Sequence, residues 1–277
     1  MTPYLNHTFS TDDFDFVSVI DELPFWSAPF GMDLLDCVRL KAGIKVLDIG
    51  CGLGFPLIEL SQRLGNSSKL FGIDPWERAL ERVNLKIRKL GIKNVEVIKG
   101  VAEDLPFDDS YFDLIVSNNG INNVDNIQQT FFECHRVSKS GAQFVFAVNL
   151  QETMIEFYNV FEDILKANSL FSEIEKMHAQ IYSKRKPLNE VESLLKGSGF
   201  TIRKIKINEF KISCLDGTSM FNHYLIKHWF LDGWKEIVNP ENLGRIFEQV
   251  ENQINDIANK KGGFALTVPY VTINSVK

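Results

Sequence analysis

The chain has 277 residues, of which 44% are hydrophobic and 24% are charged, and its formal net charge is −6. This share of apolar side chains excludes a wholly disordered chain, and the acidic balance disfavours a general binder of nucleic acids or anionic membranes. The four cysteines are scattered without the paired spacing of a zinc site, so we expect no metal. We find no signal-peptide pattern and no apolar run of about 18 residues, and we expect a cytoplasmic protein without a membrane partner.

Residues 44–150 alternate between short apolar runs and amphipathic stretches. The apolar runs predict strands at Lys45–Ile49, Lys69–Ile73, Val95–Ile98, Phe112–Ser117 and Gln143–Leu150. Helical spacing of apolar residues predicts helices at Leu57–Leu64, Glu77–Leu90 and Ile127–Arg136. The basic residues of the second helix, among them Arg82 and Lys86, are interpreted as a solvated face. A second basic cluster, Lys184–Lys186, precedes Pro187 and could meet an anionic substrate, but we favour a surface loop. Strands that alternate with helices indicate a doubly wound α/β fold with a mostly parallel sheet.

The pattern changes after Leu150. Helices are expected within residues 151–182 and 217–260 and at Leu188–Leu195, and strands at Phe200–Ile207 and Phe264–Ile273. We interpret residues 41–150 as a ligand-binding core, 151–186 as a helical cap, and 187–277 as the completion of the sheet with a second helical insert at about 217–260. Residues 1–40 are expected to form an amino-terminal helical lid. Ligands of open α/β sheets bind at the carboxyl ends of the strands, which is where a cap and lid would lie.

A glycine-rich turn follows the first predicted strand. Glycines allow the backbone to bend sharply and to approach a ligand without a Cβ atom between them. Gly50, Gly52 and Gly54 stand at relative positions 1, 3 and 5, with Phe55 at position 6. A dinucleotide fingerprint requires glycine at positions 1, 3 and 6, so the spacing opposes a nicotinamide-dependent dehydrogenase.

Two carboxylates accompany this turn. Asp48 lies near the end of the first strand, two residues before the turn, and Asp74 ends the next strand. A carboxylate at the second position can accept hydrogen bonds from both hydroxyls of a ribose. The competing interpretation is that both residues only cap turns, a common role of Asp.

Three segments taken together resemble a known family: Val46–Phe55, Gly72–Asp74 and Ala102–Phe107 with Tyr111–Ile115. They are similar to class I S-adenosylmethionine-dependent methyltransferases, most of all to the branch that contains ubiquinone and menaquinone biosynthesis enzymes and related small-molecule enzymes. The resemblance covers about residues 40–150 and implies a Rossmann-like core, here with helical cap insertions. It says little about the inserts.

The resemblance implies a site for S-adenosylmethionine, with S-adenosylhomocysteine as the product. Asp48 and the backbone of the turn would hold the methionine moiety, Asp74 the ribose, and Pro75 or Trp76 would lie against adenine. Ala102 and Glu103 would form the adenine edge, and Ser117–Asn119 would face the methyl group. The full implied set is Asp48, Gly50, Cys51, Gly52, Gly54, Phe55, Asp74, Pro75, Trp76, Ala102, Glu103, Ser117, Asn118 and Asn119.

This chain departs from the family pattern at two places. Val101 stands where relatives often carry an acid that reaches the adenine amino group, so either Glu103 takes over this contact or the contact is lost. Asn122 and Asn123 stand where a pair of histidines is common. A base at these two positions is therefore not expected.

Methyl transfer requires alignment of donor and acceptor, and oxygen or carbon acceptors usually also need a base. His223 is our candidate base, because it starts a predicted helix among aromatic residues. Trp26 and Phe30, with Tyr182 and Tyr224, are candidates to contact the acceptor; Trp26 and Phe30 either close the site or only dock an amino-terminal helix. Aromatic closure would suit an apolar or aromatic acceptor.

We therefore expect a methyltransferase that acts on a small molecule and does not bind nucleic acid. Two alternatives stay open: a methyltransferase of RNA or protein, and a protein that binds S-adenosylmethionine without transferring its methyl group. Ser117–Gly120 lacks the Asn-Pro-Pro-aromatic pattern associated with methylation of DNA amino groups. The acceptor, its reacting atom and the oligomeric state are not readable from the sequence.

Overall fold

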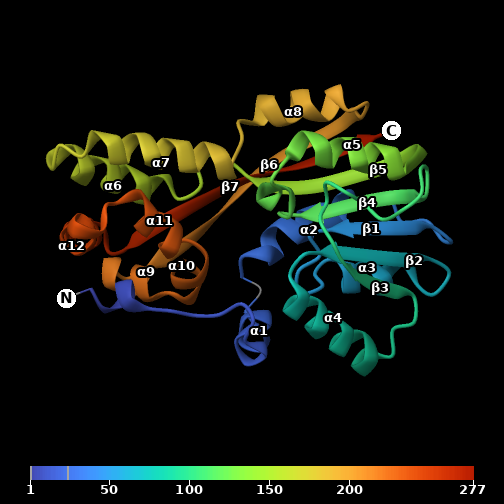
Figure 1. Ribbon diagram of the computed structural model, residues 1–277, viewed down its shortest axis with the longest axis horizontal. Helices are drawn as coiled ribbons and strands as arrows, with labels where there is room; N and C mark the ends of the chain where they lie inside the picture. Colours follow the sequence, from blue (N-terminus) through green and yellow to red (C-terminus); the bar gives the residue numbers. More distant parts are fainter. Residues whose placement is uncertain (1, 24) are drawn as a thin grey trace. The chain divides into compact units, whose positions relative to one another are not determined.

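The computed structural model describes residues 2–23 and 25–277. Within them one seven-stranded sheet has the order β3-β2-β1-β4-β5-β7-β6 (Figure 1). Neighbouring strands from β3 to β5 run parallel, and β7 is antiparallel to β5. The strands are β1 (Lys45–Ile49), β2 (Lys69–Asp74), β3 (Val95–Lys99), β4 (Phe112–Asn118), β5 (Ser138–Asn149), β6 (Thr201–Cys214) and β7 (Phe264–Val276). The sequence prediction of an α/β fold with a mostly parallel sheet is confirmed.

The chain divides into two compact units. The unit that we call the sheet unit comprises residues 10–149, 187–208 and 270–277. The other, called the helical unit, comprises residues 1–9, 150–186 and 209–269, and therefore contains both predicted helical inserts. Strands β6 and β7 contribute residues to each unit.

In the sheet unit, strand β1 lies at the point where the strand order changes direction. Asp48 of β1 is paired with Gly72 of β2 on one side and with Val116 of β4 on the other. A ligand crevice is expected at such a point, beyond the carboxyl ends of the strands. The helices of this unit are α1 (Phe14–Asp21), α2 (Ser27–Cys37), α3 (Leu57–Leu64), α4 (Glu77–Leu90), α5 (Ile127–Val137) and α8 (Leu188–Gly197), with a short 3₁₀ turn, η2 (Ile121–Asn123).

Apolar residues spaced along the helices explain how they cover the sheet. In α4, Ala79, Leu80 and Val83 are buried, while the opposite face carries charges. The helix ends at Gly91, which adopts the left-handed conformation that favours glycine at a helix end. Leu80 belongs to the same buried cluster as Val46 of β1, so the core of this unit lies between helices and sheet.

The helical unit has an aromatic core. Phe157, Phe161, Phe221 and Phe247 are fully buried together with Trp234, which accounts for part of the high phenylalanine content of the chain. In the described part of the chain no helix is long and apolar enough to cross a membrane. The elements of this unit are η1 (Pro3–Asn6), α6 (Ile155–Ala167), α7 (Phe171–Lys184), α9 (Gly217–Asn222), α10 (Tyr224–Trp229), α11 (Leu231–Ile237) and α12 (Pro240–Lys261).

The predicted elements form, but several bounds differ. Strand β5 begins at Ser138 instead of residue 143, and β6 continues to Cys214 instead of residue 207. The helical stretch 217–260 consists of four helices. Their starts coincide with capping residues, such as Asp216 before α9, whose carboxylate accepts from the backbone N–H of Ser219, and with Pro240 at the first position of α12.

Candidate functional site

The turn after β1 forms an open cradle of backbone. Gly50, Gly52 and Gly54 have φ angles of +68°, +47° and +95°, a region that side chains disfavour. A Cβ atom on Gly50 would lie 2.9 Å from the Cα atom of Gly120, so this turn and the turn after β4 approach too closely for any other residue. A Cβ atom on Gly52 would meet nothing within 4 Å. The backbone at Gly52 therefore borders space in which a ligand can lie.

Asp48 supplies a buried carboxylate next to this cradle. Its side chain is fully buried, and neither oxygen atom forms a hydrogen bond with a described residue. Burial, followed by the neighbouring charge of Asp74, raises the pKa of Asp48 well above its usual range and outweighs the opposite effect of the nearby Leu57 backbone N–H. A buried carboxylate is stable in its charged form only next to a cation or to hydrogen-bond donors, so this position fits a ligand with an ammonium group.

Asp74 at the end of β2 connects the cradle to the next strand. Its Oδ2 atom accepts a hydrogen bond from the Gly52 N–H at 2.8 Å, and its Oδ1 atom accepts one from the Trp76 N–H at 2.8 Å. Burial raises the pKa of this carboxyl, although the two amides act in the opposite direction. A carboxylate oxygen can accept more than one hydrogen bond, so both oxygens retain capacity for ligand hydroxyls.

The segment before α1 lies against the start of α4. The indole N–H of Trp76 donates to the carbonyl of Thr11 at 2.9 Å, and Nε of Arg78 donates to the carbonyl of Asp12 at 3.0 Å. Trp76 is half-buried and its ring orientation is fixed by this bond, whereas Pro75 is exposed. The amino-terminal segment and Trp76 thus form one surface of the sheet unit.

Asp21 at the end of α1 makes the second attachment of this segment to α4. Its carboxylate pairs with Nε of Arg82 at 2.7 Å and with Nζ of Lys86 at 2.5 Å. Lys86 also donates to the carbonyl of Leu53, inside the glycine turn, at 2.6 Å. Our interpretation of Arg82 and Lys86 as a solvated face is wrong, because both have a buried ionic partner that a helical periodicity cannot reveal.

Glu103 holds the loop that follows β3. Its Oε1 atom accepts hydrogen bonds from the backbone N–H groups of Asp125 and Asn126 at 2.8 and 3.0 Å. Ala102 is buried, and Val101 is exposed. Glu103 therefore fixes the residues before α5, with its second oxygen left to contact a ligand.

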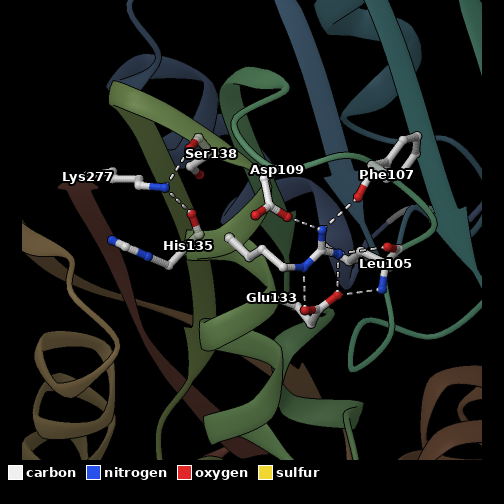
Figure 2. Close-up of polar contacts among 8 residues, drawn as sticks. Leu105, Phe107, Asp109, Glu133, His135, Ser138 and Lys277 are labelled. Atoms are coloured by element: carbon white, nitrogen blue, oxygen red, sulfur yellow. Dashed lines mark hydrogen bonds and ion pairs between the residues drawn. The ribbon is translucent and has the colours of Figure 1, made fainter.

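An arginine–glutamate pair anchors the same loop further along (Figure 2). Arg136 donates to the carbonyls of Leu105 and Phe107 at 2.9 and 2.8 Å and pairs with the carboxylate of Asp109 at 2.9 Å. Glu133 accepts from the backbone N–H of Leu105 at 2.8 Å and from Arg136. These bonds hold the loop that carries Ala102 and Glu103 in one conformation.

The end of β4 is tied to two neighbouring segments. Ser117 is fully buried and its hydroxyl donates to the carbonyl of Ile49 at 2.8 Å. The amide of Asn118 donates to the carbonyl of Ser27 at 3.0 Å, while its buried Oδ1 atom has no partner among the described residues. Asn118 therefore still has an acceptor to offer a ligand, whereas the hydroxyl proton of Ser117 is already used.

Three asparagines meet beyond the ends of β4 and β5. Asn119 has a positive φ of +61°, and its Oδ1 atom accepts from the backbone N–H of Asn149 at 3.2 Å and from the Asn122 amide at 3.3 Å. The Asn122 amide also donates to the side chain of Asn149. Sequence analysis assigned no role to Asn122, which lies in η2, or to Asn149, the last residue of β5.

Cys51 and Phe55 contribute to the turn in different ways. Cys51 is buried, and burial raises the pKa of its thiol well above the usual range, as do the nearby carboxylates. Its side chain packs at Gly72, where a Cβ atom would lie 2.8 Å from Sγ, so only its backbone is available to the cradle. The Phe55 ring packs on Gly31 of α2, where a Cβ atom would lie 2.0 Å from Cε1.

Phe30 lies in the core of the sheet unit. It is fully buried, and its ring centre is 4.7 Å from that of Tyr270 and 5.3 Å from that of Trp26. The Tyr270 hydroxyl donates to the Asp33 carboxylate at 2.8 Å, which holds α2 to β7. This geometry therefore supports docking of α2 as the main role of Phe30. Trp26 is half-buried at the edge of this aromatic contact.

The remaining candidates belong to the helical unit. His223 caps α10: its Nδ1 atom accepts from the backbone N–H of Leu225 at 3.3 Å, which places the ring proton on Nε2. Burial also lowers its pKa, and this hydrogen bonding weighs against His223 as a base. Tyr224 is half-buried beside it, with ring centres 4.7 Å apart, whereas Tyr182 is exposed with the Lys186 ammonium 3.9 Å from its ring centre.

Comparison with known proteins relates this geometry to sequence. Residues 40–162 match a family described as a methyltransferase domain. The chain is 32% identical over 158 residues to the demethylmenaquinone methyltransferase of Bacillus mycoides (strain KBAB4), a match that covers 57% of this chain and 66% of that protein. The chain thus spans just under two thirds of the length of this relative.

Solved structures show the same fold. The YcgJ protein of Bacillus subtilis is similar with a TM-score of 0.59 at 17% identity, over 90% of this chain and 98% of that one. A geranyl diphosphate methyltransferase in complex with GPP and sinefungin is similar with a TM-score of 0.54 at 17% identity, over 90% of this chain and 77% of that one. At such identities the likeness shows the fold alone, which is Rossmann-like as expected.

Proposed function

We propose that the protein transfers a methyl group from S-adenosylmethionine to a small acceptor molecule, because residues 40–162 match a methyltransferase domain and the chain is 32% identical over 158 residues to a demethylmenaquinone methyltransferase. The observation that carries the proposal is the carboxylate of Asp48, which is buried without a hydrogen-bond partner among the described residues, beside a backbone cradle with open space. A carboxylate in this position needs a cation, and the donor molecule has an ammonium group. The geranyl diphosphate methyltransferase with sinefungin, an analogue of S-adenosylmethionine, supports the same choice of donor.

The chain's residues fit this molecule as follows. Asp48 holds the ammonium group, and the backbone at Gly52 lies along the methionine chain. Asp74 accepts hydrogen bonds from the ribose hydroxyls, because each of its oxygens can accept a further bond besides the one from a backbone N–H. Trp76 and Pro75 lie at the adenine, and Asn118 offers its unpartnered Oδ1 atom near the reacting end.

When bound, S-adenosylmethionine supplies a methyl group on a positively charged sulfur. The protein's part in such a displacement is to align the acceptor and to exclude water. The hydrogen bonds that fix the glycine turn, the loop at Glu103 and the end of β4 give the site the rigidity that alignment requires. We assign no base, because His223 caps a helix and the asparagines at 119, 122 and 149 do not titrate.

A matched pair of glycine variants tests this site. Gly52 and Gly91 both have a positive φ angle, +47° and +65°, and at both positions an added Cβ atom would meet nothing within 4 Å. Each change to alanine therefore carries a similar conformational cost, about 1 kcal/mol. Only Gly52→Ala places a methyl group in the cradle, so we expect at least a tenfold loss of S-adenosylhomocysteine affinity in Gly52→Ala and none in Gly91→Ala.

Isothermal titration calorimetry measures both affinities, and urea unfolding checks that the two variants are equally stable. If Gly52→Ala binds S-adenosylhomocysteine as tightly as the natural chain, the cradle is not the site. If the natural chain does not bind this ligand at all, the proposed function is wrong.

A further inference from the structure

The helical unit contains a buried arginine that has no acidic partner. Arg185 directly follows α7 and is only 5% exposed. Its Nη2 atom donates to the hydroxyl of Tyr158 at 3.0 Å, and the guanidinium carbon lies 5.4 Å from the centre of the Tyr158 ring. Its buried Nε atom has no hydrogen-bond partner among the described residues, and no described carboxylate forms an ion pair with it.

The hydroxyl of Tyr158 adds a second unused donor. It accepts a hydrogen bond from Arg185 and another from the indole N–H of Trp234, at 3.0 Å each. Both neighbours can only donate, so these two bonds use both lone pairs of the oxygen and its own proton is left to be donated. No acceptor for this proton is found among the described residues. Together, Arg185 and Tyr158 therefore offer hydrogen-bond donors and a positive charge.

Another buried charge of the helical unit is too distant to compensate. Glu173 is 1% exposed, but it lies in the first turn of α7, whereas Arg185 follows the last residue of that helix. At 1.5 Å per residue, the eleven residues from Glu173 to Lys184 correspond to about 17 Å along the axis. An ion pair requires a separation of about 4 Å.

The partner of this arginine, Tyr158, belongs to an aromatic cluster. The Trp234 ring stacks on Phe157 with centres 3.7 Å apart, and Tyr158 meets Trp234 edge to face. A guanidinium that is only 5% exposed has lost most of its hydration, which is unfavourable unless hydrogen bonds or an anion compensate it. Arginine is also the side chain whose planar fork matches the two oxygens of a carboxylate or phosphate.

We propose that Arg185 and Tyr158 form a binding site for an oxyanion, a carboxylate or a phosphate, within the helical unit. The proposal rests on the donors and the charge described above and goes beyond the proposed function. The aromatic side chains suit an apolar or aromatic body attached to this anion. The ligand is then an anionic small molecule with an apolar part.

Three small probes test the charge and source of the anion. Benzoate carries a carboxylate, phenyl phosphate carries a phosphate, and benzamide is a neutral counterpart of benzoate. Calorimetric titration is done with the full chain, both alone and in the presence of S-adenosylhomocysteine. We expect one of the two anions to bind at least tenfold more tightly than benzamide. The tighter of the two shows whether the site prefers a carboxylate or a phosphate.

Variants separate binding from a structural role. In Arg185→Met the preference for the anion over benzamide should disappear, while thermal unfolding without ligand occurs at the same or a higher temperature, because an uncompensated charge has been removed. Arg185→Lys keeps the charge without the fork and should retain part of the preference. Tyr158→Phe removes the hydroxyl group and its proton, and should lower the affinity for the anion several-fold.

The inference is overturned if benzamide binds as tightly as both anions, if neither anion binds at 10 mM, or if Arg185→Met leaves the anion affinity within twofold. A lower unfolding temperature in Arg185→Met with unchanged anion preference would show that the arginine is structural. Affinity for S-adenosylhomocysteine, measured in each variant, reports on the sheet unit alone. Its absence in the natural chain would count against the proposed function and not against the oxyanion site.

Discussion

At the scale of single residues, Asp48 illustrates how a ligand site lowers the stability of the ligand-free protein. Its pKa is raised in the folded chain, so its contribution favours folding at low pH and is lost as the pH rises from the ordinary value of 3.8 through the raised value. At neutral pH the folded chain contains either a buried charge or a carboxyl group that has to keep its proton. Binding of an ammonium group reverses this cost.

We therefore expect Asp48→Asn to stabilise the ligand-free protein at pH 8 by about 1–3 kcal/mol, the scale of an unsatisfied buried polar group. The same variant should lose at least tenfold in affinity for S-adenosylhomocysteine. In the natural chain this affinity should fall as the solution is acidified, beginning well above pH 3.8, because the carboxylate becomes protonated. Urea unfolding and calorimetric titration between pH 5 and 8 measure these effects.

Asp113→Asn is the matched control. Burial alone would raise the pKa of Asp113, but Lys139 and the backbone N–H of Lys45 outweigh burial and hold it below its usual range. Its carboxylate is therefore already satisfied, and its loss should destabilise the protein without changing ligand affinity. Equal effects of the two substitutions on stability would show that Asp48 has an unrecognised partner.

Some candidate site residues could be predicted from the sequence, for a physical reason. Glycines after a buried strand predict a turn with positive φ angles, as Gly52 has, and Asp74 was chosen because it ends the next strand. For Lys184–Lys186 the sequence favoured a surface loop, because the burial of Arg185 against Tyr158 depends on a partner distant in the chain. The contacts of Asn149 could not be predicted for the same reason. His223 was chosen for its aromatic neighbours, and periodicity could not show that its ring caps a helix.

At the scale of elements, ion pairs connect α1 to α4. The carboxylate of Asp21 is 8% exposed and bonds to both Arg82 and Lys86. Asp21→Asn leaves these two cations without their acid, and we expect a loss of about 1–3 kcal/mol, between the values for surface and buried pairs. Faster hydrogen exchange should be confined to residues 10–22.

Glu81→Gln serves as the control on the same helix. Glu81 pairs with Arg78, but both side chains are more than 40% exposed, so its loss should change the free energy of unfolding by no more than about 0.5 kcal/mol. A similar small effect of Asp21→Asn, without faster exchange, would mean that α1 is held by apolar packing instead.

Element prediction succeeded where hydrophobic patterns are local. Strand β1 and helices α3 and α4 have the bounds that were expected, because each is a short run with one buried face. The ends of β6 and β7 were underestimated, because alternating polar and apolar residues, as in Glu209–Ser213, continue the strand without a clear stop. The division of residues 217–260 into four helices depends on caps such as Asp216, which a period of 3.6 residues does not reveal.

At the scale of the whole molecule, the chain places two kinds of ligand chemistry in two compact units. The cradle with Asp48 and Asp74 belongs to the sheet unit, and the donors of Arg185 and Tyr158 belong to the helical unit. The family match over residues 40–162 ends before Arg185. Proteins that match this domain can therefore differ in the segment that contains Arg185.

Hydrogen exchange followed by mass spectrometry tests this division in one experiment. A ligand slows exchange where it restricts local opening, so S-adenosylhomocysteine should protect residues 50–55 and 74–76. The tighter of benzoate and phenyl phosphate should protect the segments around Tyr158 in α6, Arg185 after α7 and Trp234 in α11. Protection of the same residues by both ligands, or of the glycine turn by the anion alone, would contradict separate sites. The Arg185→Met variant provides the control, because it should lose the second protection pattern and keep the first.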